Sequence, residues 1–154
     1  MKYCFYYRFE IGMITVIEEN DRIVQLLIDQ ECDEDVEVVE TVAIYTTYVQ
    51  LRDYFNGKRK SFDLKVKLDV SEFQRKVLNA ILDIPYGEVK TYQDIAKEIG
   101  NEKACQAVGN ACGSNPLPLI IPCHRVVNKD GLGNYAFGSE IKKELLELET
   151  DFKW

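Results

Sequence analysis

The run Asn115–Val127 holds the residues best suited to chemistry, because it places a cysteine beside the only histidine of the chain. A cysteine thiolate is a strong nucleophile, and its population depends on a nearby base or positive charge. His124 can supply that base, since an imidazole titrates near neutral pH. Prolines stiffen the apolar stretch before Cys123, so we expect an extended segment that presents the sulfur at a fixed point.

A histidine that acts as a base needs an acid behind it to fix its tautomer, as in a cysteine–histidine–acid triad. Neighbouring residues on an extended chain point to opposite sides, so we expect His124 to reach the sulfur through a turn or a bridging water. The predicted helix at residues 140–149 offers four acids, and spacing alone does not choose among them. They are Glu140, Glu144, Glu147 and Glu149. The structural alternative is a buried cysteine beside a structural histidine.

Composition restricts the other classes of function. The chain has 154 residues, of which 46% are apolar and 11% aromatic, so we expect a globular protein of one domain or two small ones. No apolar run approaches the roughly 20 residues of a membrane span, and no signal peptide is visible. A single histidine and the lack of a C-x-x-C pair argue against a zinc site. The formal charge of −7 argues against a general polycation that coats nucleic acid.

The five cysteines form an odd count without secretory context, which predicts reduced thiols in a cytoplasm. Apart from Cys123 they are expected to be small buried side chains. Cys105 and Cys112 are seven residues apart, so they share one face of a helix but lie too far apart for a disulfide. The remaining two are Cys4 and Cys32.

Two predicted helices precede the reactive segment. Thr91 is expected to cap the first, residues 92–99, with Asp94 completing a capping box. Asn101 is expected to cap the second, residues 102–112, whose buried face has helical spacing. That face contains Ala104, Ala107, Val108 and Ala111. Two helices joined by a short glycine-containing turn fit a DNA-binding helix-turn-helix, although plain helical hairpins share this pattern.

The first part of the chain predicts an antiparallel sheet with one helix. Strands are expected at residues 2–9, 13–19 and 22–29. A helix is expected over residues 36–55, and the acidic stretch at residues 29–37 is expected to be a solvated loop. Residues 64–70 alternate apolar and polar side chains and predict an extended linker, after which Ser71 caps another helix.

Charge is divided unevenly along the chain. Residues 1–70 carry a net charge of −5 and residues 71–154 a net charge of −2. Within the second part, residues 85–129 carry +1. The acidic excess elsewhere would keep non-specific affinity for DNA low.

Several motifs of the second part occur together. They are Ser71–Arg75, Ile84–Val89, Thr91–Ala96, Ala107–Ala111, Ser114–Pro118, Ile121–Val127 and Gly133–Tyr135. In order and spacing they resemble the alkylguanine-DNA alkyltransferases, also called methylated-DNA–protein-cysteine methyltransferases. Residues 121–127, Ile-Pro-Cys-His-Arg-Val-Val, resemble the active-site signature of that family. The resemblance covers residues 71–149, and the part before it fits the family only in architecture.

The resemblance implies an α+β fold of two domains. Residues 1–70 would form a ribonuclease H-like domain with a small antiparallel sheet and a helix. Residues 71–154 would form a mainly helical DNA-binding and alkyl-acceptor domain with a helix-turn-helix. The implied activity is direct reversal of DNA damage, in which an alkyl group leaves O-6 of a flipped-out guanine for the protein's own cysteine, once per molecule. No cofactor or metal is implied, and we expect a cytoplasmic monomer that associates with the nucleoid while scanning double-stranded DNA.

The resemblance also implies a role for each site residue. Cys123 would accept the alkyl group, His124 would act as base through a water, and Glu149 would orient His124. Asn115 would tie the active-site segment to the helix pair. Tyr92 would help to rotate the nucleotide out and hydrogen-bond guanine N3. Further substrate contacts would be Val126, Tyr135, Ala136, Phe137 and Lys142, and minor-groove DNA contacts would be Thr91, Tyr92, Ala104, Gln106, Ala107 and Gly109.

The guanine edge would be read by backbone groups, namely the carbonyls of Cys123 and Val126 and the amide of Ala136. Two positions depart from the family pattern. Gln106 stands where the family usually has an arginine that fills the space left by the flipped base, which predicts weaker and less salt-dependent DNA binding. Phe137 stands where many members have glycine, and it is expected to narrow the pocket against bulky alkyl groups.

Three other functions fit parts of the pattern. A thiol hydrolase built on Cys123, His124 and a glutamate would turn over an ester or amide. A binding module that only flags lesions would lack the acceptor, so the presence of Cys123 argues against it. A DNA-binding regulator would dock through the helix pair and keep its activity when Cys123 is replaced.

Overall fold

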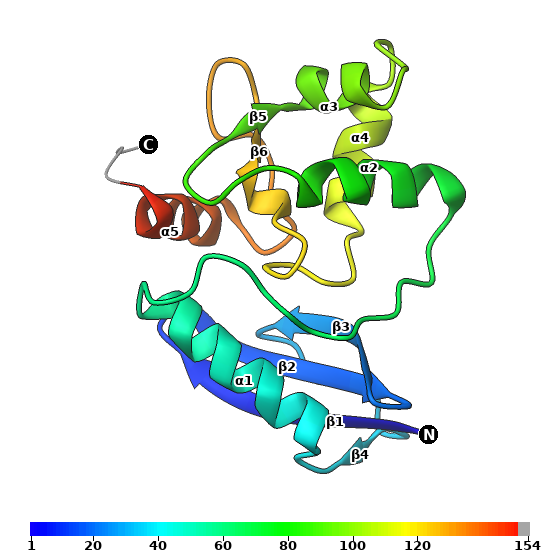
Figure 1. The fold of residues 1–154 in the computed structure, drawn as a ribbon, viewed down its shortest axis with the longest axis vertical. Helices are drawn as coiled ribbons and strands as arrows, with labels where there is room; N and C mark the ends of the chain where they lie inside the picture. Colours follow the sequence, from blue (N-terminus) through cyan, green and yellow to red (C-terminus); the bar gives the residue numbers. More distant parts are fainter. Residues whose placement is uncertain (151–154) are drawn as a thin grey trace. The chain divides into compact units, whose positions relative to one another are not determined.

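The computed structural model describes residues 1–150 and contains two compact units, Met1–Asp69 and Val70–Trp154. The first unit is a small sheet with a helix, and the second is mainly helical (Figure 1). The predicted α+β class is therefore confirmed.

The sheet of the first unit is built from consecutive strands. They are β1 (Lys2–Phe9), β2 (Gly12–Glu19), β3 (Arg22–Ile28) and the short β4 (Glu37–Val38). Their order is β3-β2-β1-β4, with β4 parallel to β1 and the other pairs antiparallel. At the turn between β2 and β3, Asn20 and Asp21 have φ angles of 52° and 64°. These left-handed conformations are typical of a two-residue hairpin turn. The three longer strands lie close to their predicted positions.

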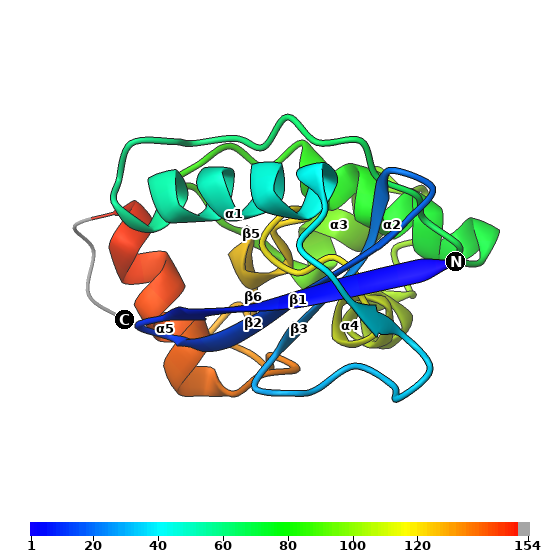
Figure 2. The same cartoon turned by 90° about the horizontal axis from the view of Figure 1, so that it is seen from below.

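Helix α1 (Val42–Phe55) packs on one face of this sheet (Figure 2). The prediction of a helix from residue 36 was wrong at its start, because Glu37–Val38 forms β4. The helix begins after Thr41, whose side-chain oxygen accepts a hydrogen bond from the amide of Ile44. Valines before this cap favour extended backbone, and the threonine fixes the first turn.

Residues 64–70 form no strand of their own but run beside β3. The amide of Ile23 donates to the carbonyl of Lys65, and the amide of Lys67 donates to the carbonyl of Ile23. The predicted extended segment therefore covers part of an edge of the sheet.

Cys4 and Cys32 form a disulfide, so the expectation of reduced thiols was wrong at these two positions. Cys4 lies in β1, and Cys32 lies in the acidic loop after β3. The hydroxyl of Tyr6 is 3.1 Å from the sulfur of Cys32. No spacing rule links a strand to a loop 28 residues later, and only the fold brings these sulfurs together.

The second unit is built around a cluster of helices. They are α2 (Glu72–Leu82), α3 (Tyr92–Glu98), α4 (Cys105–Gly113) and α5 (Ser139–Glu149), with the short 3-10 helix η1 (Cys123–Arg125). Strands β5 (Lys90–Thr91) and β6 (Val126–Val127) pair in parallel. The core contains Val77, Leu78, Ile81, Ile95, Ala96, Val108, Leu117 and Leu145. Val108 lies on the helical face that the sequence predicted to be buried.

Two helix starts follow their predicted caps. The hydroxyl of Ser71 accepts from the amide of Gln74 at 3.1 Å, at the start of α2. Thr91 and Asp94 form the reciprocal capping box at the start of α3. Local side chains alone determine these starts, which is why the sequence predicts them well.

The predicted start of the next helix was wrong. Helix α4 begins at Cys105, and its N-cap residue, Ala104, makes no side-chain cap. Asn101 instead uses its backbone carbonyl, which accepts from the amide of Ala104 at 3.0 Å. Gly100, with a φ of 79°, ends the helix before it. The connection between α3 and α4 is therefore longer than the sequence predicts.

Candidate active site

The segment that carries Cys123 is bent, so the predicted extended presentation was wrong. After α4 the chain turns, and the amide of Ile121 donates to the carbonyl of Leu117 at 2.8 Å. Leu119 within this turn has a φ of 74°. Cys123 is the first residue of η1. Prolines are compatible with turns as well as with extended backbone, and here the segment turns.

Asn115 fixes both ends of this bend. Its side-chain amide donates to the carbonyl of Ile121 at 2.9 Å, and its side-chain oxygen accepts from the amide of Leu117 at 2.9 Å. Asn115 is buried and follows directly on the end of α4. This buried side chain therefore helps to fix the position of Cys123 relative to α4.

His124 and Glu149 meet in the interior of the second unit. Nε2 of His124 lies 2.7 Å from Oε2 of Glu149, and both side chains are fully buried. Nδ1 of His124 is also buried and has no hydrogen-bond partner among the described residues. The ionised carboxylate accepts a hydrogen, so we assign the proton to Nε2, which leaves Nδ1 as an acceptor.

Arg125 completes this buried cluster, and sequence reasoning missed it. Its Nε lies 2.8 Å from Oε1 of Glu149, and its Nη2 lies 3.1 Å from Oε2. Its Nη1 donates to the carbonyl of Ile84 at 2.7 Å. The guanidinium also lies over the ring of Tyr86, 5.7 Å from its centre. The fork of Arg125 thus joins the carboxylate to the turn that follows α2.

These contacts set the charge states of the cluster. Burial alone raises the pKa of Glu149, but hydrogen bonds and charges from His124 and Arg125 outweigh it and lower the pKa to about 2. Burial lowers the pKa of His124 below its usual 6.5, although Glu149 opposes this. At neutral pH the cluster therefore contains a carboxylate and a neutral imidazole that can accept a proton.

The Cys123 thiol is 5% exposed, and its burial raises its pKa. A hydrogen bond from Asn115 and the charge of Lys142 oppose this rise. The Nζ of Lys142 donates to the carbonyls of Val126 and Asn134 at 2.6 and 2.9 Å. Burial lowers the pKa of Lys142 to about 8. A thiol in this setting stays protonated at neutral pH, so it needs a base in order to react.

A cavity of about 430 Å³ opens beside Cys123, a size that suits a small organic group such as a nucleobase. Predicted site residues that line it are Tyr92, Gln106, Gly109, Cys123, Tyr135 and Ala136. Lining residues that were not predicted are Cys105, Asn110, Cys112, Gly113, Asn128 and Asn134. The helical spacing of residues 105, 106, 109, 112 and 113 places them on one face of α4, a signal that the sequence contained.

Tyr92 forms the wall of the cavity at the start of α3. Its hydroxyl donates to the carbonyl of Asn134 at 3.3 Å. Gly133 has a φ of 76°, and a Cβ atom there would lie 2.9 Å from the Tyr92 ring and hydroxyl. Burial and the charges of Cys112 and Cys123 raise the pKa of Tyr92 to about 12. Tyr92 therefore remains a hydrogen-bond donor at neutral pH.

Other predicted residues lie away from the cavity surface. Phe137 packs edge-on against the ring of Tyr135, with ring centres 5.5 Å apart. Ala104 is 8% exposed and belongs to the core. Thr91 caps α3. The prediction that Ala107 is buried was wrong, because it is exposed on α4, and it does not line the cavity.

Two family descriptions match the chain. Residues 2–68 match "6-O-methylguanine DNA methyltransferase, ribonuclease-like domain", and residues 72–151 match "6-O-methylguanine DNA methyltransferase, DNA binding domain". The chain belongs to the 6-O-methylguanine DNA methyltransferase family. The resemblance seen in the sequence is thereby confirmed.

Relatives of this methyltransferase-family chain include archaeal and bacterial proteins. The methylated-DNA–protein-cysteine methyltransferase of Methanosarcina acetivorans is 54% identical over 101 residues, which is 65% of either chain. The constitutive enzyme of that name from Bacillus subtilis is 40% identical over 148 residues, covering 90% of each chain. The crystal structure of Mycobacterium tuberculosis OGT in complex with DNA has a TM-score of 0.90 and 35% identity, covering 97% of this chain and 93% of that one.

Two further observations concern residues 1–150 of this family member. No helix among residues 1–150 is long and apolar enough to cross a membrane. The same residues contain no group of three or more histidine, cysteine, aspartate or glutamate side chains arranged to hold a metal ion.

Among the glutamates offered by the sequence, Glu149 is the one that meets His124. It shares the buried face of α5 with Lys142, Leu145 and Leu146. Those positions are related by i, i+3, i+4 and i+7, so helical periodicity could have singled out Glu149 without any resemblance. No comparable local signal points to Arg125, because its partners lie 24 and 41 residues away.

Proposed function

We propose that the chain repairs DNA by direct reversal, moving the alkyl group from O-6 of an alkylated guanine to its own Cys123. The observation that carries this proposal is a buried thiol on the wall of a base-sized cavity, next in sequence to the His124 that pairs with Glu149. Family membership supports the same chemistry. The catalyst is consumed, because each molecule accepts one alkyl group.

The first step activates the thiol. The raised pKa of Cys123 means that a base must remove its proton, and the free Nδ1 of neutral His124 is that base, acting through a water. Glu149 orients the ring and stabilises the imidazolium that forms. Asn115 positions the sulfur by holding the bend around Leu117 and Ile121.

The second step moves the alkyl group. The Cys123 thiolate attacks the alkyl carbon, the bond from that carbon to O-6 breaks, and the electron pair leaves with guanine. Tyr92 donates a hydrogen bond to guanine N3 and helps to neutralise the departing base. The product is a thioether, which has no carbonyl for water to attack, so the cysteine reacts once. No cofactor takes part in these steps.

Recognition of the base relies on backbone groups near the cavity. The carbonyls of Cys123 and Val126 and the amide of Ala136 read the guanine edge, while Tyr135 lies along the base. The Val126 carbonyl already accepts from Lys142 and keeps a second lone pair for the base. Lys142 thus fixes a substrate-reading carbonyl and contributes positive charge near the thiol. Phe137 acts through its contact with Tyr135.

Access to guanine requires that the nucleotide be flipped out of the duplex. We propose that α3 and α4 form a helix-turn-helix, with α4 in the minor groove and Gln106 filling the space left by the base. The small Ala107 and Gly109 allow close approach of the helix backbone, and Thr91 positions the start of α3 near a phosphate. Ala104 supports α4 from the core. The protein acts as a cytoplasmic monomer on double-stranded DNA, associated with the nucleoid while it scans.

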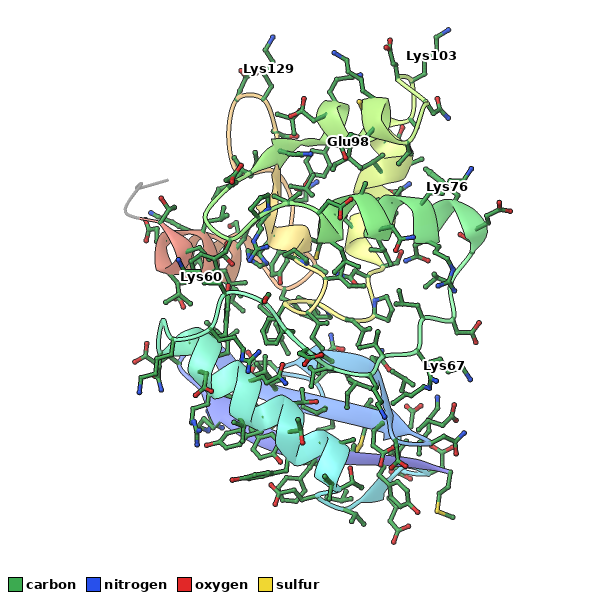
Figure 3. All side chains as sticks on the ribbon, viewed as in Figure 1. Lys60, Lys67, Lys76, Glu98, Lys103 and Lys129 are labelled. Carbon is green, nitrogen blue, oxygen red and sulfur yellow. A yellow bond between two sulfur atoms is a disulfide. The ribbon has the colours of Figure 1, made fainter. Side chains whose placement is uncertain are left out.

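Exposed lysines on the same unit fit this docking. Lys103 lies in the connection between α3 and α4, and Lys129 lies in the loop after β6. Both are exposed, and Figure 3 shows both side chains projecting away from the ribbon. Such lysines neutralise phosphates without reading sequence.

The test is incubation with a duplex that carries one O-6-methylguanine, followed by measurement of the intact protein mass. Wild type should gain one methyl group and stop after one equivalent. Cys123→Ser should gain none, and an unmodified duplex should leave both proteins unchanged. Turnover of an ester or amide without a mass gain would instead identify a thiol hydrolase.

A further inference from the structure

The cavity beside Cys123 is lined by more than one thiol. Within residues 1–150 the cysteines outside the disulfide are Cys105, Cys112 and Cys123, and all of them line this cavity. The sulfur of Cys105 is engaged, since it donates to the side-chain oxygen of Gln93 at 2.8 Å. Cys112 lies in the last turn of α4 and is partly exposed to the cavity. A second thiol is therefore open to the same space as the acceptor.

Cys112 and Cys123 line the same cavity, and Asn115 links the backbone near one to the backbone near the other. Asn115 follows Cys112 by three residues, and its side chain donates to the carbonyl of Ile121, two residues before Cys123. The two sulfurs also share electrostatic neighbours, because charge on either cysteine raises the pKa of Lys142 and of Tyr92. Charge on Cys123 contributes to the rise in the pKa of Cys112 to about 12, after burial. Lys142 and Tyr92 thus interact electrostatically with both cysteines.

We propose that Cys112 is the partner of Cys123 in a reversible disulfide that forms when a hydroperoxide enters the cavity. The Cys123 thiolate attacks the terminal oxygen of the hydroperoxide, the oxygen–oxygen bond breaks, and a sulfenic acid forms while an alcohol or water leaves. The Cys112 sulfur then attacks that sulfenic sulfur, and hydroxide leaves with the Cys112 proton as water. In sum, two thiols are oxidised to one disulfide, and the hydroperoxide is reduced.

The consequence for repair rests on the proposed function of Cys123. A cysteine oxidised to a sulfinic or sulfonic acid is lost, as is one alkylated to a thioether. A disulfide with Cys112 masks the acceptor in a form that a dithiol reductant reverses. The oxidised protein is inactive but recoverable, whereas the alkylated protein is spent.

Differential thiol labelling tests the pair directly. Trypsin cuts after Lys103 and Arg125 and nowhere between them, so it releases all three cavity cysteines in one peptide, residues 104–125. Cys4 and Cys32 lie outside this peptide. The reduced full-length chain is treated with hydrogen peroxide, and its remaining thiols are blocked with iodoacetamide before digestion. We expect the peptide to lose two hydrogens and to carry the label on Cys105 alone. A dithiol reductant should restore labelling at all three positions.

Matched variants decide which thiol is the partner. In Cys112→Ser and Cys112→Ala the peptide should gain oxygen at Cys123 instead of losing two hydrogens, and reductant should recover less labelling. Cys105→Ser should still lose two hydrogens. A wild-type peptide that gains oxygen without hydrogen loss would overturn the proposal, as would hydrogen loss that persists in both Cys112 variants. The labelling experiment needs no alkylated DNA and tests only the disulfide. Failure of the reduced chain in the methyl-transfer assay would instead contradict the proposed function.

Discussion

Glu149 holds His124 by a 2.7 Å contact between two side chains that are both fully buried. An isolated buried carboxylate is unfavourable, and here Arg125 offsets that cost with a two-point contact. Among the partners of the carboxylate, Arg125 neutralises it and His124 is oriented by it, while the amide of Gly87 also donates to it at 3.3 Å. Burial keeps His124 neutral although Glu149 opposes this, and the contact at Nε2 leaves Nδ1 as the free nitrogen.

Removing Arg125 should impair alkyl transfer through Glu149. We expect Arg125→Met and Glu149→Gln each to slow methyl transfer by roughly a hundredfold, the lower range for loss of base catalysis. The double variant should be no slower than Glu149→Gln, because both changes act on one carboxylate. Arg125→Lys should recover part of the rate, since it keeps the charge without the fork. If the effects of the two substitutions on the single-turnover rate multiply in the double variant, this coupling is contradicted. Thermal melting of each variant is the control for folding.

The stability of the protein should fall in acid in two windows. His124 has a lowered pKa in the folded state, so its contribution is present above about 6.5 and is lost as the pH falls below that value. Glu149 has a folded pKa of about 2 against 4.5. Its contribution, about 3 kcal/mol at neutral pH, is lost between pH 4.5 and 2. The free energy of unfolding, measured with urea across this pH range, should change less with pH in Glu149→Gln than in wild type. If the two curves are parallel, Glu149 is not the source of the acid sensitivity.

The residues that sequence reasoning placed correctly are those with local partners. Ser71 and Thr91 cap helices within three residues of themselves, and the hairpin turn at Asn20 needs only its own backbone. The prediction that Asn101 caps a helix was wrong because its backbone carbonyl, rather than its side chain, accepts from the amide of Ala104. Capping rules weigh side chains and do not anticipate such a turn.

Residues with distant partners were missed for a different reason. Arg125 bonds to Ile84 and Glu149, and the disulfide joins Cys4 to Cys32. None of these pairs has a periodic spacing that a single sequence reveals. Cys123 follows the bend at residues 115–122, a segment that was expected to be extended. Site chemistry was therefore predictable from residue types, and helical faces from periodicity, whereas the contacts between distant residues were not.

Gly133→Ala should disturb Tyr92. Gly133 has a φ of 76°, and a methyl group there would lie 2.9 Å from the Tyr92 ring and 3.2 Å from the amide of Asn128. We expect a stability loss of at least about 1 kcal/mol from the left-handed backbone alone, and slower methyl transfer because the wall of the cavity moves. Gly131→Ala is the matched control, since nothing lies within 4 Å of its added Cβ. Equal melting temperatures and rates for the two variants would refute the role of Gly133.

Phe137→Gly should speed the reaction with bulky substrates. Phe137 supports the ring of Tyr135, which lines the cavity. Without that support Tyr135 gains freedom to move, and the space for a large alkyl group grows. The expected result is a rise in the benzylguanine rate relative to the methylguanine rate, measured by labelling of Cys123. An unchanged ratio of the two rates would show that Phe137 does not restrict the cavity.

Gln106→Arg should strengthen binding to DNA and make it more dependent on salt. Gln106 is exposed on α4 at the cavity and carries no charge. One added phosphate contact should steepen the plot of log affinity against log salt by about 0.9, through counterion release. Gln30→Arg adds the same charge at an exposed position of the first unit, in the acidic loop. If the gain comes from a specific contact near the flipped base, only Gln106→Arg changes the slope by that amount. If net charge alone matters, the two variants change it equally, and the proposed position of Gln106 against DNA is wrong.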